Sequence, residues 1–144
     1  MGKKNDWNCQ FWRMVEYANG LGFEILLDSD EEDRVDFDET TIYIKSRNHP
    51  ETKFYTLLHE IGHAEIFVNS SRKFEEDHPM FYQYSDGRVE RSYAYRVSIV
   101  AEEIEAWRVG RNIARNLKLF IDDEKYDKHM TASLMTYINW ASDQ

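Results

Sequence analysis

Apolar and polar residues alternate along the chain with periods that distinguish helices from strands. In the first part, Phe11, Met14, Val15 and Ala18 recur at spacings of three and four, and an Asn-Gly pair follows them. This spacing is typical of a helix with one buried face, and Asn or Gly commonly ends a helix. The pattern predicts a helix over residues 6–19.

Three short stretches then have the composition of strands. Residues 23–27, 34–37 and 41–45 are rich in β-branched and aromatic side chains, and acidic turn-forming residues separate them. Such runs favour strands joined by short connections. The pattern predicts a small three-stranded antiparallel meander.

The rest of the chain returns mainly to helical periodicity. A helix is predicted from Pro50 to Val68, because proline is favoured at the first helical position and apolar residues follow at helical spacing. Residues 98–120 and 123–140 show the same period, whereas residues 70–97 are polar, aromatic and irregular. This order of elements predicts an α+β fold in which the irregular stretch is a long connection.

The length and charge of the chain limit its class. A chain of 144 residues is expected to form one core, so residues 1–144 are predicted to be a single domain. Asp and Glu outnumber Lys and Arg by 27 to 18, which disfavours binding to nucleic acids and anionic membranes. Cys9 is the only cysteine, and no apolar run is long enough for a signal peptide or a membrane span. These features predict a cytoplasmic protein and leave the oligomeric state open.

The stretch YTLLHEIGHAEI lies within the helix predicted to begin at Pro50. His59 and His63 are four residues apart, so both imidazoles project from the same helix face and can reach one ion. Zinc accepts imidazole nitrogens, and a catalytic zinc site combines three protein ligands with an open position for water. Glu60 lies beside that position and is predicted to act as the general base.

The alternative is an exposed face of His and Glu that binds no metal. An accidental H-E-x-x-H pattern is rare in a chain of this length. In addition, Leu57, Leu58, Ile61 and Ala64 flank the motif and would anchor it in the core. The metal-binding interpretation is therefore favoured.

A catalytic zinc site needs a third ligand, and the chain after the motif offers His78, Glu102, Glu103 and Glu105. His78 lies in the irregular connection, where no helix positions it. On the next predicted helix, Glu103 falls at the centre of the apolar stripe, whereas Glu102 lies at its edge and Glu105 on the polar side. A carboxylate within an apolar stripe is costly to bury unless it is paired or binds a metal. Glu103 is therefore the predicted ligand.

An ion pair is the alternative explanation for a buried Glu103. Arg96 and Arg13 are the candidate partners. The preceding H-E-x-x-H motif favours metal ligation over this ion pair.

These two motifs resemble a known family. LLHEIGHA, followed by the helical E-x-E-A that begins at Glu103, resembles the glutamate-zincins, most of all the small intracellular ImmA/IrrE-type metallopeptidases. The resemblance covers roughly residues 10–118. It implies a minimal zincin fold, with His59, His63 and Glu103 as zinc ligands and Glu60 as the base. It also implies a sheet whose edge strand, expected to be TIYIK, aligns a peptide substrate by β-augmentation.

The chain departs from the family pattern at Trp107. Related glutamate-zincins often carry Asp or Asn at this position, four residues after the ligand Glu, where Asp can orient a zinc histidine. Any residue with that role must therefore come from elsewhere in this chain.

Residues 70–97 join the two predicted zinc helices, so they are expected to form a lid or a substrate wall over the cleft. Amide hydrolysis also needs a hydrogen-bond donor for the oxyanion. Tyr93, Tyr95, His78 and Arg96 are candidates because they lie in this connection.

The sequence thus predicts a zinc-dependent peptidase, specifically a selective endopeptidase that acts on a protein or peptide with Zn²⁺ as cofactor. The alternative is a catalytically silent protein that keeps the zincin shape and captures a partner. A zinc hydrolase for a non-peptide bond is a third interpretation.

Overall fold

The computed structural model describes residues 6–28, 30, 32–77 and 92–143. Its elements confirm the predicted α+β class. In chain order they are α1 (Trp7–Gly20), β1 (Glu24–Asp28), β2 (Arg34–Asp36), β3 (Thr41–Lys45), α2 (Pro50–Glu65), the π-helix η1 (Ile66–Ser70), α3 (Ser71–Asp77), α5 (Tyr93–Asn116) and α6 (Asp123–Ser142).

The region predicted to be irregular, residues 70–97, is partly helical. Residues 71–77 form α3, and α5 begins at Tyr93 because the Ser92 hydroxyl accepts a hydrogen bond from the Tyr95 backbone nitrogen at 3.1 Å. Hydroxyl side chains at this position satisfy a backbone donor that the first helical turn leaves unpaired. Residues 78–91, the middle of the predicted lid, lie outside the described residues.

The sheet is mixed, so the predicted antiparallel meander is wrong. Its strand order is β1-β3-β2, with β3 parallel to β1 and antiparallel to β2. The physical reason lies in burial: Ile42 and Ile44 of β3 are fully buried, whereas β1 and β2 are more exposed. The most apolar strand therefore takes the central position, where both of its edges are hydrogen-bonded.

This order also corrects the expected substrate strand. TIYIK is β3, the central strand, and it has no free edge for a peptide because both neighbours are paired with it. The free edges belong to β1 and β2. Residues in and around β2 line the main cavity, so β2 is the edge strand nearest the site.

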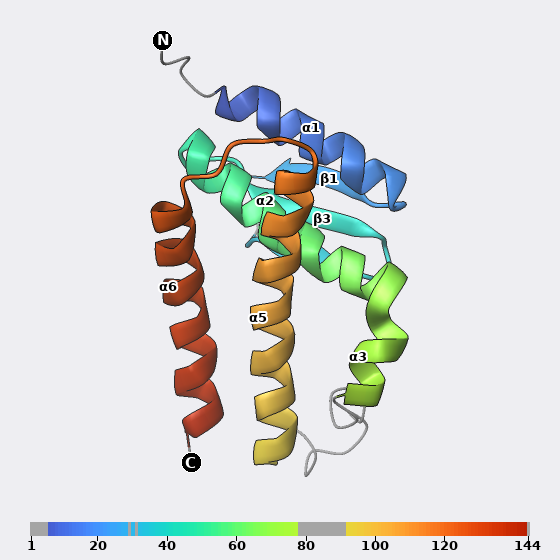
Figure 1. The fold of residues 1–144 in the computed structure, drawn as a ribbon, viewed down its shortest axis with the longest axis vertical. Helices are drawn as coiled ribbons and strands as arrows, with labels where there is room; N and C mark the ends of the chain where they lie inside the picture. The colour runs from blue at the N-terminus through green and yellow to red at the C-terminus, as the bar shows by residue number, and fades with distance from the viewer. Residues whose placement is uncertain (1–5, 29, 31, 78–91, 144) are drawn as a thin grey trace.

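The core lies between the sheet and two helices. α1 packs against β1 and α2, and α2 packs against β3 (Figure 1). The buried cluster includes Met14 from α1, Ile42 from β3 and Phe54 from α2, all with no exposed surface. Among the described residues, no helix combines the length and apolar composition needed to cross a bilayer.

Two glycines set the close crossing of α2 and α5. A Cβ at Gly62 would lie 1.9 Å from the carbonyl oxygen of Ala106, and a Cβ at Gly110 would lie 2.1 Å from the carbonyl oxygen of Leu58. The two backbones can approach this closely only because neither glycine carries a side chain. The crossing brings the polar residues of α5 against the H-E-x-x-H motif.

α6 runs beside α5 (Figure 1). Its fully buried Tyr126 donates a hydrogen bond to the carbonyl oxygen of Trp107 at 2.5 Å. Arg111 of α5 forms ion pairs with Asp123 at 3.3 Å and Asp127 at 2.8 Å. These contacts place one face of α6 over the α2–α5 crossing.

Candidate metal centre

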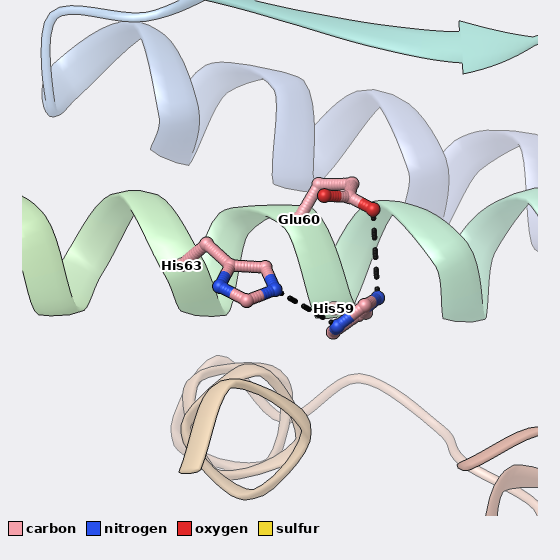
Figure 2. Close-up of side chains that lie close together, drawn as sticks. All are labelled: His59, Glu60 and His63. Atoms are coloured by element: carbon pink, nitrogen blue, oxygen red, sulfur yellow. Dashed lines mark hydrogen bonds and ion pairs between the residues drawn. The ribbon is translucent and has the colours of Figure 1, made fainter. Parts of the chain in front are cut away.

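The H-E-x-x-H residues lie on the buried middle of α2. His59, Glu60 and His63 are each less than a tenth exposed. The Nε2 atoms of His59 and His63 are 3.0 Å apart, and both rings lie on the same side of the helix (Figure 2). The spacing of four residues thus produces the convergence that ligation of one ion requires.

Glu103 approaches both imidazoles from α5. Its carboxylate oxygens lie 2.9 Å from His59 Nε2 and 3.1 Å from His63 Nε2. Neither proposed ion-pair partner takes this place: Arg13 is exposed, and Arg96 donates to carbonyl oxygens near the end of α6. Among the described residues, the side chains of His59, His63 and Glu103 form one compact cluster in the core.

The donor set fits a divalent metal ion. An ion with tetrahedral geometry and bonds of about 2.0 to 2.1 Å holds neighbouring ligand atoms about 3.3 Å apart. The observed separations among His59, His63 and Glu103, from 2.9 to 3.1 Å, are close to that value. Two imidazole nitrogens and a carboxylate are also ligands that zinc and related ions accept.

Glu102 fixes the orientation of His63. The Nδ1 atom of His63 lies 2.5 Å from both carboxylate oxygens of Glu102, so Nδ1–H donates to Glu102. In a neutral imidazole of this tautomer, Nε2 carries a lone pair, and that lone pair faces Glu103. A cation between these two acceptors satisfies both, as in other sites where a carboxylate orients a ligating histidine.

Trp107 holds the other histidine. Its ring stacks on His59 with centroids 4.2 Å apart and an angle of 8° between the planes. Trp107 is only 4 % exposed, so the stack is almost entirely buried beside the cavity. The residue that departs from the family pattern therefore positions His59 by stacking, and Glu102 supplies the carboxylate that orients the other histidine.

Charges within the cluster shift two pKa values in opposite directions. Burial alone would lower the pKa of His63, but the carboxylates of Glu102 and Glu103 hold it well above its ordinary value. Burial alone would raise the pKa of Glu103, but hydrogen bonds from His59 and His63 lower it to about 2. In the protein without metal, a proton on His63 thus offsets part of the buried negative charge.

Glu60 lies close to both histidines of the cluster. Its carboxylate is 3.4 Å from His59 Nδ1, and burial is the main cause that raises its pKa above the ordinary value. The charges of Glu103 and Asp33 raise this pKa further, against the lowering effect of the two histidines. A carboxylate with a raised pKa takes and returns a proton near neutral pH more readily than an ordinary glutamate.

The cluster forms the floor of an open cavity of about 570 Å³. Such a volume is in the range of ligand-binding pockets in proteins. β2 and its flanking turns form one wall, and α6 forms another. Besides His59, Glu60, His63, Glu102 and Glu103, the lining residues are Asp33, Arg34, Val35, Phe37, Thr56, Trp107, His129, Ser133, Thr136 and Tyr137.

Comparison with known protein families identifies the family of this chain. The model of the IrrE N-terminal-like domain, Peptidase_M78, matches residues 16–118. This chain belongs to that family. No curated protein and no solved structure gives a significant match.

Membership in Peptidase_M78 makes the chain a metallopeptidase with a candidate His59-Glu60-His63 and Glu103 site. The predicted resemblance to IrrE-type metallopeptidases is thereby confirmed. The matched region contains α2 and α5 and ends before α6, so the helix that forms one wall of the cavity lies outside it.

In this Peptidase_M78 member, the candidate oxyanion donors in the connection do not line the cavity where the structure describes them. Tyr93 is 56 % exposed near the start of α5, and Tyr95 is absent from the cavity lining. Arg96 stacks on Tyr93 and Trp140, away from the cluster. His78 lies outside the described residues.

Sequence reasoning missed the roles of Glu102 and α6. Glu102 was assigned to the edge of the apolar stripe, and that edge is buried against His63. In α6, His129, Ser133 and Tyr137 are four residues apart and share the inward face with Tyr126. Polar residues at this spacing on a buried helix face were the signal that could have identified the wall.

Proposed function

We propose that this chain is a zinc-dependent, selective endopeptidase. The observation that supports it best is the convergence of His59, His63 and Glu103 in the buried floor of an open cavity. We assign these three residues as the metal ligands. Structural zinc sites are closed by four protein ligands, whereas three ligands facing a cavity leave a position for reaction.

Each residue at the site has a role in amide hydrolysis. When bound, zinc supplies a Lewis acid that polarises the scissile carbonyl and lowers the pKa of water to about 7. Glu60 removes a proton from the attacking water and delivers it to the leaving amine. Glu102 and Trp107 hold His63 and His59 in the orientation that ligation requires.

The substrate lies along the free edge of β2. Asp33, Arg34 and Val35 line the cavity next to the cluster, and within the described part of the chain β2 pairs with β3 alone. An extended peptide can therefore add to this edge through backbone hydrogen bonds. This places a protein or peptide segment across the cavity with its scissile bond near Glu60.

Metal content tests the ligand assignment. Wild type, His63→Ala and Glu103→Ala are purified identically without chelator and analysed by elemental mass spectrometry. We expect about one zinc per wild-type chain and loss of zinc from both variants, because each removes one of three ligands. Zinc retained by Glu103→Ala would remove Glu103 from the ligand set, and metal-free wild type would contradict zinc dependence altogether.

Glu60→Gln separates catalysis from capture of a partner. Glutamine is nearly isosteric and cannot accept the proton, so the variant keeps the metal site and loses hydrolysis. We expect normal zinc content and loss of cleavage in a screen of peptides and metabolites. An unchanged biological effect of Glu60→Gln would support a silent capture protein, and turnover of a metabolite alone would support a non-peptide hydrolase.

A further inference from the structure

Tyr137 lies on α6 and lines the cavity together with His59, Glu60 and Glu103. It is partly buried on the inward face of the helix, two turns beyond His129 and three beyond Tyr126. The family model ends at residue 118, so Tyr137 belongs to a part of the chain that family membership does not describe.

The phenol of Tyr137 shares its surroundings with the proposed reaction centre. The side chain of Tyr137 lines the same cavity as Glu60, Glu102 and Glu103. The phenol group of tyrosine is a hydrogen-bond donor at neutral pH. Its neighbours are the proposed ligand and the proposed base.

Hydrogen bonds on both sides of Tyr137 hold α6 against α5. Near its start, Tyr126 donates to the carbonyl oxygen of Trp107 at 2.5 Å. Near its end, Arg96 of α5 donates to the carbonyl oxygens of Trp140, at 3.4 Å, and Asp143. Tyr137 therefore projects from a rigid element, which catalytic groups need if they are to act without reorganisation.

The other donors in the α6 wall are less suited to the reaction centre. His129 lies two turns earlier, where its ring packs against Tyr55 with centroids 5.7 Å apart. Ser133 and Thr136 have short side chains that reach less far from the helix. Tyrosine combines a long reach with only two side-chain torsions, so its hydroxyl is placed at low entropic cost.

We propose that Tyr137 is a catalytic residue whose hydroxyl donates a hydrogen bond to the oxyanion that forms at the scissile carbonyl. When the water oxygen bonds to the carbonyl carbon, the π electron pair moves to the carbonyl oxygen, and Tyr137 stabilises that negative charge without transferring its proton. The carbon–nitrogen bond then breaks as the amine takes the proton carried by Glu60. This inference rests on the proposed peptidase function.

Binding of a tetrahedral anion to the cobalt-substituted protein tests the role of Tyr137. Tyr137→Phe keeps the ring and removes the hydroxyl; Tyr43→Phe makes the same change on β3, outside the cavity. Co²⁺ affinity and binding of inorganic phosphate are both followed through the visible absorption of Co²⁺. We expect Tyr137→Phe to bind phosphate about tenfold more weakly, because it loses one hydrogen bond to a charged acceptor, with Co²⁺ affinity and thermal stability unchanged.

The outcomes separate this inference from the proposed function. One result is that wild type binds Co²⁺ while both tyrosine variants bind phosphate equally; another is that wild type binds Co²⁺ while no phosphate binds at all. Either result overturns the role of Tyr137 and leaves the metal site intact. A loss of Co²⁺ affinity in Tyr137→Phe would make Tyr137 a positioning residue for Glu103. Wild type that binds no Co²⁺ overturns both. On any peptide that wild type cleaves, kcat of Tyr137→Phe should fall about 10²- to 10³-fold, with little change in KM.

Discussion

Substitution of Gly62 by alanine tests whether the close crossing of α2 and α5 builds the site. A Cβ at Gly62 would lie 1.9 Å from the carbonyl oxygen of Ala106 and 2.7 Å from its carbonyl carbon, whereas ordinary contact begins at 3.4 Å. The obstacle is backbone, so no side-chain rotation relieves it. The two helices must separate by about 1.5 Å, or α2 must bend at the motif.

Two opposing effects set the stability of Gly62→Ala. Alanine is favoured over glycine within a helix by about 1 kcal/mol. Overpacking of a tight core costs about 1 to 3 kcal/mol, and a clash with backbone places this site at the upper end. We therefore expect a net loss of about 1 to 2 kcal/mol in the free energy of unfolding.

Gly62→Ala should affect zinc affinity more strongly than it affects stability. Ala106 is one turn from Glu103, so a shift of α5 at Ala106 carries the Glu103 carboxylate away from His59 and His63. Metal–ligand distances in functional sites vary by only about 0.2 Å. A displacement of about 1 Å is therefore expected to weaken zinc binding by at least tenfold.

Urea unfolding of the metal-free protein measures the change in stability, and competition with a chelator measures the change in zinc affinity. Gly20→Ala is the matched control, because a Cβ at Gly20, the last residue of α1, has no atom within 4 Å. Gly62→Ala with wild-type stability and zinc affinity would refute the argument that glycine at this crossing sets the position of Glu103.

Three further predictions follow from contacts of the helices α1, α2 and α5. Glu102→Gln should lower zinc affinity about 10- to 100-fold in a chelator competition, because glutamine is a weaker acceptor for His63 Nδ1–H; unchanged affinity would contradict that role. Trp107→Ala should lower the free energy of unfolding by about 3 to 5 kcal/mol in urea titrations of metal-free protein, since it empties a buried site beside His59; a loss below 1 kcal/mol would contradict tight packing. Burial and Glu65 raise the pKa of Tyr17 to about 12, so its contribution to stability is intact below pH 10 and lost as the pH rises toward 12. Tyr17→Phe should therefore lose less stability than wild type over that interval, and parallel curves would contradict the shift.

The elements that the sequence predicted well are those whose signals are local. α2 begins at Pro50, as its sequence pattern predicts, and the H-E-x-x-H motif lies on its buried middle. Glu103 was predicted to have a buried partner because a carboxylate in an apolar stripe requires one, and its side chain lies against His59 and His63. In these cases, helical periodicity alone predicts which side chains share the buried face of a helix.

The features that the sequence did not predict depend on contacts between distant segments. Strand composition indicates that β1, β2 and β3 exist but carries no information on their order, so the central position of β3 was missed. Trp107 was noted only as a departure from a family pattern, because stacking on His59 requires knowledge of the angle at which α2 and α5 cross. That angle depends on Gly62 and Gly110, whose effect appears only when both backbones are present.

The charges of the cluster explain why the site and the fold depend on each other. Glu60, Glu102 and Glu103 are all less than a tenth exposed, and the imidazoles of His59 and His63 lie against them. Buried carboxylates without compensation destabilise a fold by several kcal/mol. In the protein without metal, a proton on His63 supplies part of the compensation, and a divalent ion supplies more charge at the same place. We therefore expect metal and proton to compete for this buried position, so that metal binding releases a proton and stabilises the α2–α5 crossing.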